Sequence, residues 1–509
     1  MASRRNILFI TADQWRGDFL PWARTPFLSL PNIEALARGG VTFHRHFTVT
    51  SPCGPARASL LTGLYQMTHR AVQNTIPLDA RHTNIAKEVR KAGYDPALVG
   101  YTTTTPDPRT TGPADPRFTV LGDVMDGFRA LANLDPYPAM HEYFRWMAGK
   151  GFALPENHHD IWLPRAGDAG PSASPMRAPA ALSDSAWMTE VALAYLQDHG
   201  NAPWFLHLCY WRPHPPFIAP EPYNSAFRAT DMPGPTRKAS VAEEAATHPL
   251  LRFYLESTRN SSYFHGADGL ASDLDDAAIR QARATYCGLM AEVDHHLGRV
   301  LDFVRDSGQW DDTLIVFTSD HGEMLGDHHQ FGKSGYFDPI FHVPLVIRDP
   351  LAPVETRGTG VDAFTESVDI MPTILDWMGA PVPRTCDGMS LLPWCRGRPV
   401  TPWRQEAHFE FDFRDLWYIK PQSALGLPME SCSLAGIRGV RDKYVHFAAL
   451  PPVFFDLESD PNEMHDRVAD PAYGPRLLAS AQKLLSWRLQ HADRTLTGFR
   501  ATPQGLEER

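Results

Sequence analysis

Short apolar runs alternate with helix-like segments through most of the 509-residue chain, and this alternation restricts its fold more than any other feature. The predicted strands are 6–11, 96–99, 204–211 and 314–318. The predicted helices are 33–38, 58–65, 85–92 and 279–304. In the last of these, apolar residues recur every three or four positions, which is typical of a helix packed on a sheet. The sequence therefore predicts an α/β fold, with a mostly parallel sheet sandwiched by helices.

The pattern changes after Pro383, where residues 436–448 and 452–457 resemble antiparallel strands and 477–491 a helix. A chain of this length is expected to divide, because single cores rarely grow past about 250–300 residues. We therefore predict a catalytic domain over 1–384 and a smaller C-terminal α+β domain over 385–509. Residues 105–180 and 225–275 interrupt the alternation, and we predict that they are insertions at one rim of the sheet.

Composition excludes several classes of protein. The net charge is −11 with no basic block, so the chain lacks the cationic surface that nucleic-acid binding requires. No apolar run reaches the roughly 18 residues of a membrane span. The apolar run 7–10 is too short for a signal peptide, and the six cysteines have no paired spacing. We expect a cytoplasmic protein with reduced thiols and neither a nucleic-acid nor a membrane partner.

Two predicted strands end in an aspartate, Asp13 in "FITADQ" and Asp320 in "VFTSDHG". The carboxyl ends of parallel strands meet at one sheet edge, so both carboxylates are predicted there, followed by Gln14 and His321. This oxygen-rich set with one nitrogen suits Ca²⁺, Mn²⁺ or Mg²⁺. A strand-end aspartate can instead cap the next helix. For Asp320, the polar, glycine-rich loop 320–335 that follows favours a functional site.

A histidine and a lysine near these strands are further candidates. Prolines on both sides of His214 in "YWRPHPPF" fix its backbone, which suits acid–base catalysis, although a loop histidine bound to the backbone is the alternative. Lys333 lies in the loop 320–335 and can hold an anion, whereas a solvated surface lysine is the commoner fate.

Cys53 lies in "TSPCGPAR", ahead of a predicted helix. Pro55 suits the first position of that helix, which places Cys53 at its N-terminus, where N–H groups and the helix dipole attract anions. Arg57 follows in the first turn. A thiolate would be stabilised there, and so would a sulfate or phosphonate oxygen. A lone cysteine is nevertheless more often an inert buried thiol.

The run Cys53–Gly54–Pro55–Ala56–Arg57 resembles the Cys-x-Pro-x-Arg signature of type I sulfatases in the alkaline phosphatase superfamily, whose cysteine is oxidised to formylglycine. The resemblance covers nearly the whole chain, including "NILFITADQWRGD", "TLIVFTSDHGEMLGDHHQFGKSG", "VDIMPTILDWMGAPVP" and "FFDLESDPNE". It implies an alkaline-phosphatase-like fold and ester hydrolysis.

One difference from most sulfatases indicates which branch of the family this chain resembles. Most sulfatases have Gly-Lys-x-His where this chain has Gly100–Tyr101–Thr102–Thr103. In this respect, and in "DHG" and "AVQNTIPLD", the chain resembles phosphonate monoester hydrolases and related arylsulfatases, which implies that Asn74, Tyr101 and Thr103 bind substrate. Loss of two cationic groups weakens the grip on a dianion more than on a monoanion. The implied substrates are therefore aryl sulfates, phosphonate monoesters and phosphodiesters.

The resemblance also implies roles for the site residues. Formylglycine at position 53, hydrated to a geminal diol, is the nucleophile; Arg57 lowers the cost of ionising its attacking oxygen, and Lys333 balances charge on the transferring group. His214 protonates the leaving group. One divalent cation, Mn²⁺ or Ca²⁺ before Mg²⁺, is held by Asp13, Gln14, Asp320, His321 and residue 53. The implied partners are a small-molecule ester and a formylglycine-generating enzyme. Apolar residues in 417–438 predict a subunit contact, and hence a homodimer or homotetramer.

Two other functions stay open. A two-metal phosphatase or phosphodiesterase of the same superfamily would use an unmodified nucleophile and a second set of Asp and His ligands. A catalytically silent binding protein would have lost part of the set Asp13, Arg57, His214, Asp320 and Lys333, and all five are present.

Overall fold

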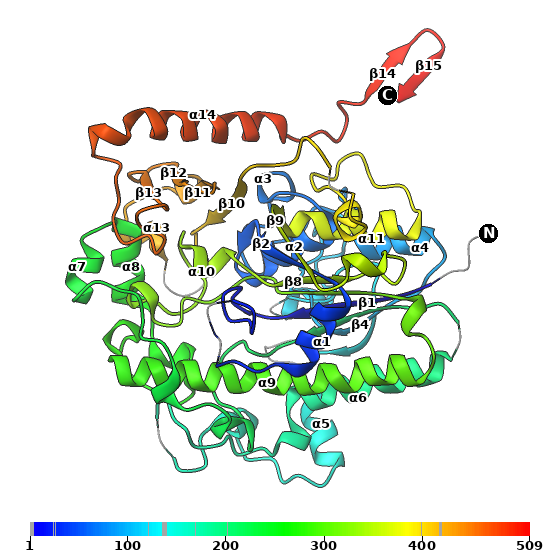
Figure 1. Cartoon of the computed structure of the whole chain (residues 1–509), viewed down its shortest axis with the longest axis vertical. Coiled ribbons are helices and arrows are strands. Elements are labelled where there is room, and N and C mark those ends of the chain that lie inside the picture. The colour runs from blue at the N-terminus through cyan, green and yellow to red at the C-terminus, as the bar shows by residue number, and fades with distance from the viewer. Residues whose placement is uncertain are drawn as a thin grey trace.

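A computed structural model of the chain describes residues 5–23, 25, 27–120, 122–134, 140–167, 169–200, 202–398, 400–416 and 420–508. Its centre is an eight-stranded sheet in the order β5-β4-β6-β1-β7-β8-β2-β9 (Figure 1). The strands are β1 Asn6–Ala12, β2 Val41–Phe47, β4 Pro96–Gly100, β5 Arg129–Asn133, β6 Phe205–Tyr210, β7 Thr313–Thr318, β8 Leu345–Arg348 and β9 Thr359–Glu366. β8 runs antiparallel to β7 and β2, and the other neighbours are parallel. The predicted mostly parallel sheet is confirmed.

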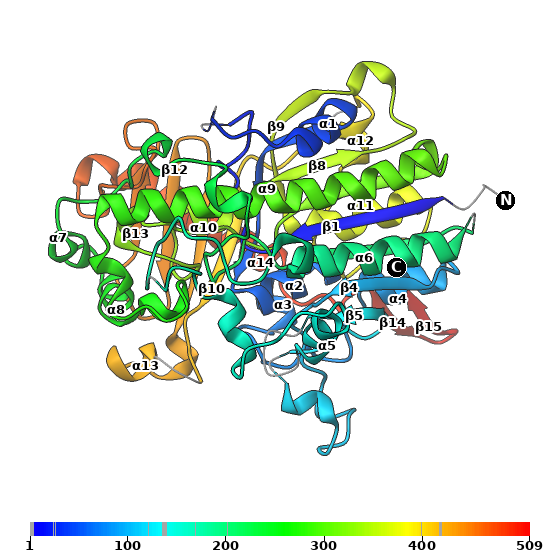
Figure 2. The same ribbon diagram turned by 90° about the horizontal axis from the view of Figure 1, so that it is seen from below.

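Helices cover both faces of this sheet. Against one face pack α1 Pro31–Gly39, α5 His141–Gly149, α6 Asp184–His199 and α9 Asp276–Asp306. Against the other pack α2 Cys53–Thr62, α4 Ile85–Lys91, α11 Ile370–Met378 and α12 Leu392–Cys395. Figures 1 and 2 show α6 and α9 running alongside one another on their face of the sheet. Because both faces are covered, β1 and β7 are buried along their whole length and consist largely of apolar residues.

A second sheet has five strands in the order β13-β12-β11-β10-β3. They are β3 Thr50–Ser51, β10 Ala407–Asp412, β11 Ser433–Arg438, β12 Asp442–Phe447 and β13 Val453–Asp456. Helix α14, Gly474–Gln490, covers one face through Leu484 and Trp487. The sheet is antiparallel except where β3 pairs with β10 in parallel. The small sheet thus takes its edge strand from the N-terminal part of the chain, and the domain boundary at residue 384 stays a prediction.

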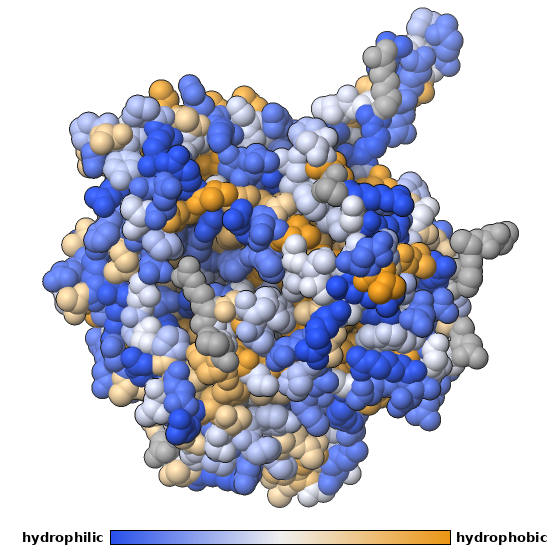
Figure 3. All heavy atoms as spheres, viewed as in Figure 1, coloured by the Kyte–Doolittle hydropathy of each residue, from blue (hydrophilic) through white to orange (hydrophobic). Residues whose placement is uncertain are grey.

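The remaining elements lie outside the two sheets, and the helices 241–245, 249–257 and 338–341 among them pack against the small sheet. They are α3 Gln66–His69, α7 Val241–Ala245, α8 Pro249–Ser257, α10 Asp338–Phe341, α13 Pro421–Ala424, β14 Phe499–Thr502 and β15 Gly505–Glu508. The β14–β15 hairpin projects from the body of the molecule and is largely hydrophilic (Figure 3). No helix in the described ranges has the length and apolar character needed to cross a membrane.

Two predicted segments differ from expectation. Residues 105–180, predicted as an insertion, contribute the edge strand β5 and the helix α5 to the main fold; 121, 135–139 and 168 lie outside the described residues. In the predicted contact segment 417–438, residues 433–438 form β11, an inner strand of the small sheet, and 417–419 lie outside the described residues. The predicted subunit contact is thus not a continuous exposed arm.

Candidate active site

Helix α2 carries Cys53 as its first residue, so the expected position at a helix N-terminus is confirmed. The helix begins five residues earlier than predicted, and Pro55 occupies its third position instead of its first. The Asn74 side chain supports this end of the helix, because its Oδ1 accepts a hydrogen bond of 2.8 Å from the Gly54 N–H. The Asn74 amide therefore fixes the backbone directly after Cys53, as an N-cap side chain would.

Asp13 and Asp320 meet at the carboxyl edge of the neighbouring strands β1 and β7, as the strand ends predict. One ligand atom from each of Asp13, Cys53, Asp320 and His321 lies within 4.8 Å of the others, and all four residues are buried. His321 Nδ1 donates to the Gly322 carbonyl at 3.0 Å. Its Nε2 is left as an acceptor, 3.2 Å from Cys53 Sγ.

Lys333 also lies in this group and not on the surface. Its Nζ donates to Gln14 Oε1 at 2.7 Å and to Cys53 Sγ at 3.1 Å. The amide oxygen of Gln14 therefore faces the same space as the four clustered ligand atoms. Two carboxylates, an imidazole nitrogen and an amide oxygen are a donor set that fits a hard or borderline divalent cation.

Arg57 bridges the two metal-site carboxylates. Its Nη2 donates to Asp13 Oδ2 and its Nε to Asp320 Oδ2, both at 2.9 Å. All three residues are at most 2% exposed. Burial and the nearby Asp13 raise the pKa of Asp320 to about 6, which the Arg57 guanidinium opposes. The site therefore holds two carboxylates together by one buried guanidinium.

The expected stabilisation of a Cys53 thiolate is not found. Burial and the adjacent Asp13 carboxylate raise the pKa of Cys53 well above its usual range, and Lys333 opposes this only in part. The helix N-terminus is outweighed because the thiol is 5% exposed and lies next to two carboxylates. These surroundings oppose ionisation of an unmodified Cys53 thiol.

His214 and the residues of 101–103 line the same region. His214 Nδ1 donates to the Pro215 carbonyl at 2.7 Å, and burial and the Lys333 charge lower the pKa of His214 to about 3. The Tyr101 hydroxyl donates to Asp13 Oδ2 at 2.5 Å. Thr103 is 8% exposed, and within the described ranges no hydrogen-bond partner of its hydroxyl is found. The roles assigned to these residues stay predictions.

Family profiles match the chain almost end to end. The profile described as Sulfatase matches residues 5–380, and that described as N-sulphoglucosamine sulphohydrolase, C-terminal, matches residues 326–490. The chain belongs to the sulfatase family. The chain is 55% identical to a "Multifunctional alkaline phosphatase superfamily protein PehA" of Trinickia caryophylli, over 100% of this chain and 99% of the relative. The predicted membership is thereby confirmed.

Two solved structures share the fold of this sulfatase-family chain. A phosphonate monoester hydrolase of Agrobacterium radiobacter is 44% identical, with a TM-score of 0.95 over 99% of this chain and 100% of that one. A phosphonate monoester hydrolase of Silicibacter pomeroyi is 38% identical, with a TM-score of 0.93 over 99% of each chain. The protein is therefore a hydrolase related to phosphonate monoester hydrolases, and the reading as a silent binding protein is set aside.

Some residues of this sulfatase-family site were not assigned from the sequence. Glu323 accepts a hydrogen bond from Gln14 Nε2, Tyr286 donates to the Gln14 carbonyl at 2.6 Å, and Cys209 Sγ lies 2.7 Å from Arg57 Nη1. Glu323 stands in the loop 320–335, which the sequence does single out, but nothing in its spacing shows which acidic side chain turns inward. Cys209 and Tyr286 read as ordinary core residues.

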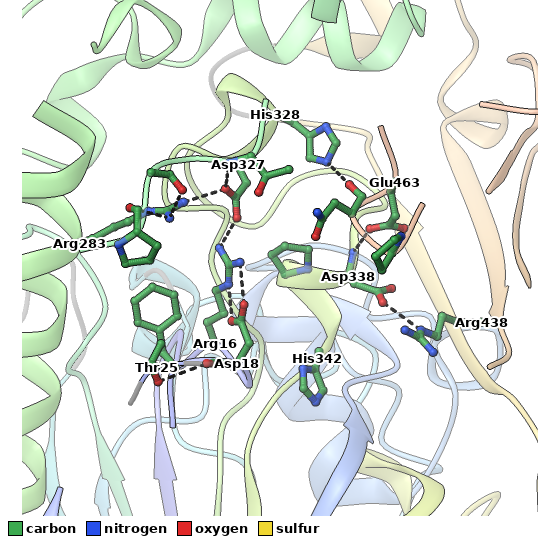
Figure 4. A pocket seen from close by; sticks show the side chains of 17 residues that line it. Arg16, Asp18, Thr25, Arg283, Asp327, His328, Asp338, His342, Arg438 and Glu463 are labelled. Atoms are coloured by element: carbon green, nitrogen blue, oxygen red, sulfur yellow. Dashed lines mark hydrogen bonds and ion pairs between the residues drawn. The ribbon is translucent and has the colours of Figure 1, made fainter. Parts of the chain in front are cut away.

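A charged cavity of about 340 Å³ lies beside the same loop (Figure 4). Arg16, two residues after Gln14, and Arg283 of α9 both point at Asp327, each with a nitrogen–oxygen distance of 2.7 Å. These pairs fix the loop 320–335 against the segment that follows β1.

Among the described residues, the group around Cys53 is the one cluster with metal-site geometry, so no second ligand set supports the two-metal alternative.

Proposed function

We propose that this chain is a formylglycine-dependent hydrolase of monoanionic esters, acting on phosphonate monoesters and aryl sulfates and, less selectively, on phosphodiesters. The observation that carries the proposal is the position of Cys53 at the N-terminus of α2, within 4.8 Å of the ligand atoms of Asp13, Asp320 and His321. The names of the relatives, a multifunctional PehA and two phosphonate monoester hydrolases, support the same substrate classes.

A divalent cation bound by Asp13, Gln14, Asp320 and His321 would acidify a hydroxyl at residue 53 and neutralise charge on the transferring group. The donor set favours Mn²⁺ or Ca²⁺, with Mg²⁺ possible. Conversion of Cys53 replaces its sulfur and two hydrogens by one oxygen, for which a formylglycine-generating enzyme supplies the oxidant. The aldehyde then takes up water to give two hydroxyls on one carbon.

One of these hydroxyls ionises, losing its proton to solvent, and its oxygen attacks sulfur or phosphorus while the bond to the leaving oxygen breaks in line. His214 donates a proton to that oxygen through Nε2 as the imidazolium, because its Nδ1 proton is held by the Pro215 carbonyl; the negative charge that develops on the leaving oxygen favours this protonated form against burial and Lys333. Lys333 lies 3.1 Å from Cys53 Sγ and balances charge on the transferring group. A base then removes the proton of the second hydroxyl, the carbon–oxygen bond to the product breaks, and the aldehyde is restored.

Charge explains the preference for monoanions. Of the two cationic side chains in direct contact with the site, Arg57 is neutralised by Asp13 and Asp320, which leaves Lys333. Tyr101 and Thr103 stand where most sulfatases have two cationic side chains, and they offer hydrogen bonds without charge. Asn74, through its NH₂ group, and Thr103, through its hydroxyl, are proposed to bind the non-reacting oxygens of the ester, whereas the Tyr101 hydroxyl is donated to Asp13 and orients that carboxylate.

The test compares kcat/KM for 4-nitrophenyl sulfate, 4-nitrophenyl phenylphosphonate, bis(4-nitrophenyl) phosphate and the dianion 4-nitrophenyl phosphate. The full chain, coexpressed with a formylglycine-generating enzyme, should favour the three monoanions, and peptide mass spectrometry should find residue 53 lighter by roughly 18 Da. Cys53→Ala should lose all four activities. The matched control is Cys395→Ala, a buried cysteine of α12, which should retain them.

Full activity in Cys53→Ala, or in a metal-loaded protein that carries only the thiol at residue 53, would refute the nucleophile. A preference for the dianion 4-nitrophenyl phosphate would refute the charge argument but not the assignment of the nucleophile.

We further propose, from the sequence, a cytoplasmic homodimer or homotetramer. Sedimentation of the purified chain would test its oligomeric state.

A further inference from the structure

The backbone of Gln14 is fixed on both sides. Its carbonyl accepts the Tyr286 hydroxyl at 2.6 Å, and its N–H donates to Asp320 Oδ1 at 3.2 Å. Its φ of 68° lies in the left-handed region, which a glutamine adopts only where the surroundings enforce it. The Gln14 side chain therefore starts from a single, enforced position and direction.

The two ends of the Gln14 amide meet different neighbours. Nε2 donates to Glu323 Oε2, whereas Oε1 accepts from Lys333 Nζ at 2.7 Å and faces the ligand group. An ionised carboxylate only accepts hydrogen bonds, so it selects the NH₂ end of an amide. Glu323 at the NH₂ end and Lys333 at the oxygen end thereby both turn Gln14 Oε1 toward the metal site.

Glu323 is itself held rigidly. It is 0% exposed, and its Oε1 accepts the N–H groups of Leu325, at 3.0 Å, and Gly332. The Glu323 N–H donates to the Pro339 carbonyl at 3.0 Å. With Oε1 satisfied by two backbone donors, Gln14 is the one side chain among the described residues that donates to Oε2.

We propose that Glu323 is a positioning residue that presents the side-chain amide oxygen of Gln14, Oε1, to the divalent cation. The inference rests on the proposed function, because it requires a cation at Asp13, Asp320 and His321. Glu323 contacts neither substrate nor the four clustered ligand atoms directly; it acts by fixing the polarity of one amide. Removing such a support typically weakens metal binding about 10- to 100-fold.

This proposal is tested by exchanging the hydrogen-bond donor and acceptor between Gln14 and Glu323. In Glu323→Gln, the Leu325 and Gly332 N–H groups still claim the oxygen, so the NH₂ group at position 323 faces the NH₂ group of Gln14; the Gln14 amide loses its acceptor and is held in place by Lys333 alone. The full-length chain, freed of metal by a chelator and titrated with Mn²⁺ in a calorimeter, should bind about 10- to 100-fold more weakly. In the double variant Q14E/E323Q, the carboxylate at position 14 accepts a hydrogen bond from the amide at position 323. Its other oxygen is then offered to the cation. The Mn²⁺ affinity of the double variant should return to within about threefold of wild type. The single variant Gln14→Glu should bind Mn²⁺ weakly, as Glu323→Gln does, because its carboxylate faces that of Glu323.

The matched control is Glu410→Gln, another buried glutamate, which accepts from the Met67 N–H and Arg488 and should leave Mn²⁺ affinity unchanged. Wild-type affinity in E323Q, or no recovery in the double variant, overturns the inference. If E323Q fails to fold, the double variant carries the test, since folding and Mn²⁺ binding should both return in it. Failure of the wild type to bind Mn²⁺, or binding unimpaired by Asp320→Asn, refutes instead the metal site of the proposed function.

Discussion

Replacing Arg57 by methionine should destabilise the metal-free protein far more than the metal-loaded one. Arg57 donates to Asp13 and Asp320 at 2.9 Å each, and all three side chains are at most 2% exposed. Removing one partner of a buried ion pair costs about 3–5 kcal/mol, because the remaining charge is left without compensation. Methionine fills most of the vacated volume, so the loss is chiefly electrostatic.

A bound divalent cation would supply positive charge to the same two carboxylates. The cost of losing Arg57 should therefore be smaller by at least about 1.4 kcal/mol when the cation is present. By linkage, that difference equals the gain in cation-binding free energy, and it corresponds to about tenfold tighter binding. We thus expect Arg57→Met to be less stable in chelator yet to bind Mn²⁺ more tightly than wild type.

The assay is urea unfolding followed by tryptophan fluorescence, with chelator and with saturating Mn²⁺, together with calorimetric titration of Mn²⁺. Arg212→Met is the matched control, since Arg212 is 1% exposed and pairs with buried Asp184 at 3.0 Å. Its loss of stability should not depend on Mn²⁺. Equal destabilisation of Arg57→Met in both conditions, or weaker Mn²⁺ binding, would show that Arg57 positions the carboxylates and does not compensate their charge.

Two further predictions concern the proton donor and the acid stability of the fold. His214→Asn should lower kcat/KM by about 10²–10⁴-fold for esters with poor alkoxide leaving groups and much less for 4-nitrophenyl esters, so an equal loss for both would contradict the proton-donor role. Glu366 is fully buried, yet Arg404 and His408 lower its pKa from 4.5 to about 2. Because the folded-state pKa is depressed, this carboxylate contributes about 3 kcal/mol above pH 5 that is lost as the pH falls toward 2. Glu366→Gln should flatten that part of the pH dependence in urea unfolding with chelator present, and an unchanged profile would refute it.

The sheet edge at which Asp13 and Asp320 meet was predictable from the sequence, because the carboxyl ends of parallel strands lie at one edge of a sheet. Asp13 and Asp320 follow apolar strands, and neighbouring parallel strands bring their carboxyl ends together whatever lies between them in the chain. The position of Cys53 followed from helix-start signals, although Pro55 was assigned to the first position of the helix and occupies the third. Local rules thus predicted that the two carboxylates and Cys53 lie together.

What could not be predicted depends on contacts between distant elements. Strand β2, "VTFHRHF", has charged residues within it, and its pairing with β9 is fixed only by the assembled sheet. The same holds for side-chain direction: the Tyr101 hydroxyl, predicted to face substrate, donates to Asp13, and Glu323 turns inward from a loop with several acidic residues. Motif spacing identifies such residues without showing which neighbour each one contacts.

The two-residue strand β3 has a consequence for how the protein could be matured. Thr50 and Ser51 pair with Glu410 and Phe411, and Cys53 follows at once, 5% exposed. The segment that a modifying enzyme must reach is thus closed by a strand from near the far end of the chain. If Cys53 is converted to formylglycine as proposed, conversion and folding would compete in time, and the interval for conversion would end once residues 407–412 are made and docked. A natively folded, unconverted chain should resist the enzyme that a urea-unfolded chain accepts, and ready conversion of the native chain would refute this order of events.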